Sequence, residues 1–200
     1  QTNKINVYLY LKEKGLRHEA IVGIMANIGK ETYDTYSYKT QQEDGPGYGL
    51  FQLDPGGDHV KQYNMFLERN KITDSMESQV DYFLESIYDT KSPALKSNGT
   101  GNARNLRNLF NSGTVEEITQ GITEKWERPK DYLNSIDNPK DEEKKKTYEN
   151  NLRDRIVRAD KLNKEVDTFN KQFFSVYKKD LRYLPTNVNK VLGTFSTVKG

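Results

Sequence analysis

Three features of the sequence predict a mainly helical fold with one small non-helical lobe. Apolar residues recur at spacings of three and four along most of the 200 residues. Helix-boundary residues separate these runs. The segment from Tyr33 to Gly57 breaks the pattern, with five Gly, two Pro and five Tyr or Phe. A chain of this length can bury one core of its own.

The first two helices are predicted on either side of Gly15, which is placed to end the first one. Ile5, Tyr8 and Leu9 form the apolar stripe of the first helix. The second helix carries the stripe Ile21, Ile24, Met25 and Ile28, which predicts deep burial.

The segment 33–57 is predicted to form a small β-hairpin or an ordered loop. Tyr36-Ser37-Tyr38 alternates as a strand does, and residues 43–47 have turn chemistry. Following directly on a helix, this lobe could form one wall of a substrate groove.

Helices are predicted to resume after the lobe. Asp58 is a candidate cap, and two capping boxes are predicted at Asp74 with Glu77 and at Thr114 with Glu117. Residues 92–93 and 98–101 read as loops. Pro129 ends the helix that contains Trp126.

The C-terminal third is predicted to begin with an exposed connection, Asp131 to Lys146, followed by one long helix from Tyr148 to Tyr177. The tail from Leu184 loses periodicity. We therefore expect a catalytic domain at 1–160, and at 161–200 a helical extension and linker toward a part that is absent from this sequence.

Composition excludes several classes of site. With no Cys and only two His, no cofactor or metal is expected. The net charge of +2 comes from interleaved charges, which does not favour nucleic-acid binding. The longest uncharged stretch, 20–29, is too short to span a membrane.

Glu31 is the residue most indicative of chemistry. It lies three and seven positions after Ile28 and Ile24, near the end of the buried helix, and Asn27 is four positions back. Apolar surroundings would raise its pKa, as a proton donor at neutral pH requires. By periodicity alone, a surface Glu that ends a core helix is the more common case.

The lobe adds groups suited to a saccharide. Aromatic rings such as Tyr36 and Tyr48 can stack on sugar faces, and Gln52 can bind hydroxyl or acetamido groups. A tight turn is the simpler interpretation of residues 47–52 taken alone.

Four blocks occur in order: Gly15-Leu16, Ala20 to Thr32, Gly47-Tyr-Gly-Leu-Phe-Gln-Leu53, and Trp126-Glu-Arg-Pro129. This set resembles the phage tail lysozyme family, which is related to goose-type lysozymes and lytic transglycosylases, over about residues 5 to 159. The resemblance implies a lysozyme-like α+β fold, peptidoglycan as substrate, other tail proteins as partners and a place in the virion tail.

By this resemblance Glu31 is the catalytic acid, and Tyr48, Gln52, Tyr36 and Glu127 contact the saccharide. Asp44, or next Asp54, is the candidate second carboxylate, although each is individually more typical of a turn. Three reactions remain open: cleavage by a muramidase, by an N-acetylglucosaminidase or by a lytic transglycosylase. A non-catalytic wall- or tail-binding module is the alternative of another class.

Overall fold

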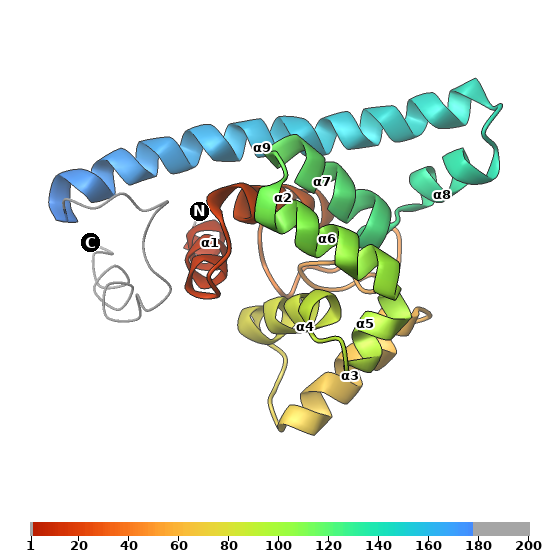
Figure 1. Ribbon diagram of the computed structural model, residues 1–200, viewed down its shortest axis with the longest axis horizontal. Helices are drawn as coiled ribbons and strands as arrows, with labels where there is room; N and C mark the ends of the chain where they lie inside the picture. The colour runs from red at the N-terminus through yellow and green to blue at the C-terminus, as the bar shows by residue number, and fades with distance from the viewer. Residues whose placement is uncertain (1, 178–200) are drawn as a thin grey trace.

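The computed structural model describes residues 2–177, and within this range the regular secondary structure is helical (Figure 1). The helical elements are α1 (Thr2–Glu13), α2 (His18–Glu31), α3 (Asp58–Asn70), α4 (Met76–Tyr88), α5 (Pro93–Asn98), α6 (Thr100–Ser112), α7 (Val115–Ile122), the π-helix η1 (Thr123–Glu127), α8 (Lys130–Asp137) and α9 (Glu142–Tyr177). The predicted mainly helical fold is confirmed.

Helix α2 is the centre of the core. Its residues 20–29 are buried without interruption, and it packs most extensively against α7 and α9. Figure 1 shows α9 lying across these two helices along one side of the molecule. A Cβ at Gly23 would stand 2.5 Å from the Ile118 side chain, so glycine is required for the close approach of α2 and α7.

Helices α3, α4 and α5 form the side of the molecule opposite α9 (Figure 1). An aromatic cluster joins them to the centre: Phe51 stacks on Phe83 with centroids 4.6 Å apart, and both rings contact Trp126. The indole Nε1 of Trp126 donates to Ser86 Oγ at 2.8 Å. The two sides of the molecule therefore share one core.

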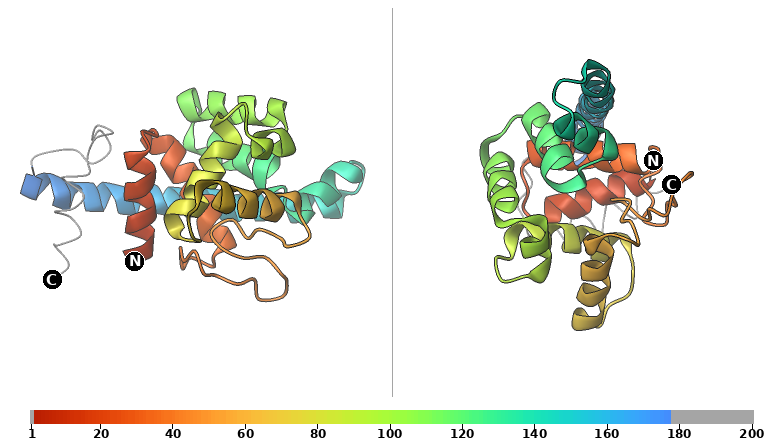
Figure 2. Two further views of the ribbon diagram at one scale, coloured as in Figure 1. Left: turned by 90° about the horizontal axis from the view of Figure 1, so that it is seen from below. Right: turned by 90° about the vertical axis from the view of Figure 1, so that its right-hand side faces the viewer.

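The predicted β-hairpin in the segment 33–57 is not shown. Between residues 33 and 57 the structure has only two isolated bridges, Gln41 with Tyr48 and Tyr48 with Leu53. Positive φ angles at Tyr33, Asp34, Tyr36, Gly49 and Gln52 turn the chain too often for paired strands. This 33–57 loop runs outside the helices in both views of Figure 2.

Two of the predicted caps are wrong in detail. The N-cap of α3 is Gly57, and Asp58 is the first helical residue. The capping box of α4 is formed by Ser75 and Ser78, because Asp74 is engaged by side chains of other segments. The box of Thr114 with Glu117 on α7 is confirmed.

Helix is present in residues predicted as loops (92–93 and 98–101) and in the predicted connection 131–146. Residues 93–98 form α5, since Ser92 caps it and Pro93 occupies its first turn, where proline is tolerated. Residues 130–137 form α8 directly after Pro129. The prediction missed both because short helices show too few apolar repeats.

Helix α9 runs through residue 160, the predicted end of the catalytic domain. Beyond it, Leu162 and Val166 are buried, and Glu165 pairs with Lys4 of α1 at 3.0 Å. The predicted tail from Leu184 lies outside the described residues. None of the described helices has the length and apolar character that a membrane span requires.

Candidate active site

Glu31 is the last residue of α2. The helix ends there because the Thr32 hydroxyl donates to Ile28 O at 2.7 Å and accepts the Tyr36 amide at 3.0 Å, while Tyr33 has φ 51°. The side chain of Glu31 is 19% exposed. A carboxylate at the negative end of a helix dipole is unfavourable unless a cation compensates it.

Arg155 of α9 supplies that cation. Its Nη2 donates to Glu31 Oε1 at 2.7 Å, and its side chain is 2% exposed. The prediction of purely apolar surroundings for Glu31 is therefore wrong, because a buried guanidinium binds its carboxyl group.

Asn27 holds Arg155 in place instead of bonding Glu31. Its Oδ1 accepts from Arg155 Nη1 at 2.8 Å and from the Thr123 hydroxyl at 3.0 Å. Its Nδ2 donates to the carbonyl oxygens of Gly23 and Thr119. A single buried amide thus links α2, α7, η1 and α9.

Glu127 is the second carboxyl of this region and the last residue of η1. The Arg128 amide donates to Thr123 O at 2.8 Å, five residues back, and Arg128 then turns the chain with φ 47°. Single turns of π-helix occur frequently at functional sites. Glu127 Oε1 is buried and has no hydrogen-bond partner among the described residues.

Burial raises the pKa of Glu127 well above its ordinary value. The negative charge of Glu31 raises this pKa further, and the positive charge of Arg155 opposes the shift. Glu31, Glu127 and Arg155 are therefore electrostatically coupled, and we call them the carboxylate–arginine cluster. It brings together two of the predicted site residues.

Tyr48 and Gln52 lie in the 33–57 loop. Some of their polar atoms form hydrogen bonds within the protein. The Tyr48 hydroxyl donates to Asp74 Oδ2 at 2.9 Å, and burial raises the pKa of Tyr48 to about 12. Gln52 Nε2 donates to Thr40 O and Gly49 O, whereas its Oε1 is buried without a partner in the described structure. Their contact with a saccharide stays a prediction.

Tyr36 is 2% exposed. Its ring packs against α2, where a Cβ at Gly29 would stand 2.6 Å from the Tyr36 hydroxyl. The Lys4 ammonium lies 5.2 Å from the ring centroid. This burial argues for a packing role rather than for the predicted contact with a sugar.

Asp44 and Asp54, the predicted second carboxylates, are both exposed. Asp54 Oδ1 accepts the Gly56 amide at 2.8 Å, and its carbonyl accepts the Gly57 amide, as in an ordinary Asp turn. Neither residue is joined to Glu31 by any contact found in the described structure.

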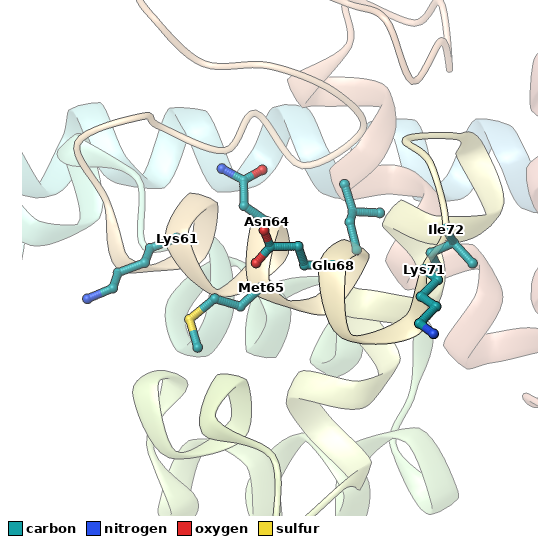
Figure 3. Close-up of a pocket in the computed structure, with 7 residues that line it drawn as sticks. Lys61, Asn64, Met65, Glu68, Lys71 and Ile72 are labelled. Carbon is teal, nitrogen blue, oxygen red and sulfur yellow. The ribbon is translucent and has the colours of Figure 1, made fainter.

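Two surface hollows lie on or beside α3. One follows the outer face of this helix and contains Lys61, Met65 and Lys71 (Figure 3). The other is formed with α4 and contains Asp81 and Tyr88. Neither hollow contains Glu31 or Glu127, so the predicted saccharide groove stays a prediction.

Sequence reasoning missed Arg155, although a signal for it exists. Leu152, Arg155, Ala159, Leu162 and Val166 follow one another at spacings of three and four on α9. Arg155 thus occupies a core position of the apolar stripe, where an arginine needs a buried acceptor. Its neighbour Ile156 fits the same periodicity in the sequence but is only half-buried.

Comparison with known proteins identifies one family. Searches of curated proteins and of solved structures gave no significant match. A family model, that of the phage tail lysozymes, matches residues 2–161. This range includes all three members of the carboxylate–arginine cluster and covers most of the chain. The chain belongs to the phage tail lysozyme family.

Proposed function

We propose that this protein cuts the glycan strand of peptidoglycan between N-acetylmuramic acid and N-acetylglucosamine, from the tail of a phage that is entering its host. Membership in the phage tail lysozyme family supports a lysozyme-like enzyme acting on peptidoglycan. The bond and the location are the finer parts of the proposal.

One observation carries the proposal: Glu31 stands at the end of a rigid, buried helix and is held by Arg155 beside Glu127. Cleavage of a glycosidic bond requires a positioned carboxyl that protonates the leaving oxygen. We assign this role to Glu31, because its carboxyl is partly exposed while Glu127 Oε1 is buried.

The position of Glu31 also suits electrostatic support of the reaction. An oxocarbenium-like transition state carries positive charge, which a nearby carboxylate stabilises. Since the site contains two carboxyls and one guanidinium, it carries negative charge unless one carboxyl is protonated. A module that only binds cell wall would gain nothing from a buried carboxyl oxygen without a hydrogen-bond partner.

Digestion of purified peptidoglycan, with mass spectrometry of the products, tests this proposal. N-acetylmuramic acid at the new reducing ends would support it. N-acetylglucosamine there would indicate a glucosaminidase, and 1,6-anhydro ends a lytic transglycosylase. The variant Glu31→Gln should give no products, whereas Glu19→Gln, at the opposite end of α2, should digest as the native chain does. Cell-wall binding without any products would indicate the binding module.

A further inference from the structure

The carboxylate–arginine cluster has an unequal balance of buried charge. Two carboxyls share one guanidinium, and Arg155 has given its bonds to Glu31, Asn27 and Asn151. No bond from Arg155 to Glu127 is found in the described structure. The buried Oε1 of Glu127 therefore has no hydrogen-bond donor among the described residues.

Several charged groups on the same helices have partners of their own. On α9 and α2, Asp154 binds Lys30 at 2.6 Å and also pairs with Arg158, which donates to Asp34 at 3.0 Å. On η1, Glu124 accepts from the Tyr148 hydroxyl at 2.7 Å.

Two further groups approach from α8 and α3. Asp131 of α8 accepts from Asn151 Nδ2 at 3.1 Å. His59 of α3 stacks on Trp126, the neighbour of Glu127, and burial lowers the pKa of His59 to about 4, so it is neutral at pH 7. Arg155 is bonded to Glu31, and its positive charge also acts on Glu127.

We infer that Glu31 and Glu127 hold one proton between them at neutral pH, and that Arg155 is the positioning residue that biases this proton toward Glu127. Two ionised carboxylates in one buried site repel each other, and a single guanidinium bonded to one of them does not neutralise both. In the described structure Arg155 makes its bond to Glu31 and none to Glu127, and burial raises the pKa of Glu127.

This inference rests on the proposed function and changes how its pH dependence arises. For catalysis the shared proton must first move to Glu31, which passes it to the leaving oxygen. The glycosidic C–O bond then breaks, the proton leaves with the departing sugar, and both carboxyls are left ionised. The attacking water then adds its oxygen to the anomeric carbon and returns one proton to the pair. The alkaline limit of activity is therefore a property of the pair and not of Glu31 alone.

The pH–rate profile of lysis separates this arrangement from a site with one independent acid. Glu127→Gln removes the group that makes a second ionisation costly, so the alkaline limb should move to lower pH by about one unit or more. Arg155→Gln removes the opposing cation, so the limb should move to higher pH. Arg155→Lys keeps the charge and should restore a profile close to that of the native chain.

Matched controls come from the same elements. Glu124→Gln, on η1, and Arg158→Gln, one turn along α9 from Arg155, should leave the alkaline limb unchanged. An unmoved limb in Glu127→Gln, or movement in the same direction in Glu127→Gln and Arg155→Gln, would overturn the inference.

A second measurement does not depend on activity. Because native Glu127 binds a proton that the unfolded chain releases near the ordinary Glu range, native stability should fall as pH rises above that range. The difference in Tm between Glu127→Gln and the native chain should therefore increase from pH 5 to pH 8. A constant difference would refute the shared proton even if Arg155→Gln failed to fold. An increasing difference without lysis by the native chain would support the shared proton and refute only the proposed function.

Discussion

Two acidic clusters in this protein handle a partly buried carboxylate in opposite ways. Asp74 accepts from the Tyr48 hydroxyl, from the Tyr63 hydroxyl at 2.6 Å and from Gln79 Nε2 at 2.9 Å. We call this the Asp74 cluster. In the carboxylate–arginine cluster, by contrast, Glu127 Oε1 has no donor among the described residues.

The Asp74 cluster fastens the 33–57 loop to α4. Gln79 continues it, donating to Tyr38 O at 3.0 Å and accepting the Leu50 amide at 2.8 Å. Three neutral donors therefore satisfy the carboxylate of Asp74. The lesson of the comparison is that a saturated carboxylate stabilises the fold, whereas an unsaturated one can exchange a proton.

The largest expected effect tests whether the carboxylate–arginine cluster is catalytic. Glu31→Gln keeps the side-chain outline but cannot release a proton, so lysis should fall at least about a hundredfold. The same change leaves buried Arg155 without its carboxylate and should lower the free energy of unfolding by about 1–3 kcal/mol. Turbidity assays on cell walls and denaturant melts measure the two effects. Nearly native lysis by Glu31→Gln, together with loss in Glu127→Gln, would exchange the roles of the two residues.

The second effect concerns His59, whose ring stacks on Trp126, the residue before Glu127 in the chain. Its ordinary pKa is lowered from 6.5 to about 4 by burial, and the Tyr82 hydroxyl lies 2.8 Å from Nδ1. The unfolded chain therefore binds more protons than the native one between these two values. Stability should be complete above about pH 6.5 and should fall by about 3 kcal/mol as the pH drops to 4.

Melting curves between pH 4 and pH 7 check this expectation for His59. The variant His59→Gln cannot titrate and should lose less stability over the same range. Equal losses in both proteins would place the acid sensitivity in another group.

The third effect tests whether the Asp74 cluster stabilises the fold. Asp74→Asn keeps one acceptor but replaces the other oxygen by a donor that faces the Tyr48 or Tyr63 hydroxyl. The free energy of unfolding should fall by about 2 kcal/mol, because hydrogen bonds to a charged acceptor are lost. Glu127→Gln at pH 7 should instead leave stability equal or higher. If both variants lost the same stability, the distinction between the two clusters would be wrong.

The smallest effect separates packing from substrate contact at Tyr48. Tyr48→Phe removes one hydrogen bond to Asp74 and should reduce the free energy of unfolding by about 1 kcal/mol. Since the ring remains, kcat/KM per folded molecule should change little, whereas Tyr48→Ala should lower it further if the ring contacts the saccharide. A native kcat/KM in Tyr48→Ala would assign Tyr48 a structural role alone.

Much of the fold could be read from local patterns. The stripe of α2, the glycine after α1 and the capping box at Thr114 are interactions between residues a few positions apart, so they are visible in the sequence. The short helices α5 and α8 escaped prediction because their stability comes from packing against other elements, which has no local signal.

The sequence by itself determined the helical architecture, through helix periodicity, and singled out Glu31 as the candidate acid, through a set of short motifs. Tertiary structure alone decided which charges surround Glu31. Arg155 lies 124 positions away from it, and Glu127 96 positions away, at the end of a π-helical turn. Coulomb energy depends on distance in space and on burial, and neither can be obtained from the separation of residues along the chain.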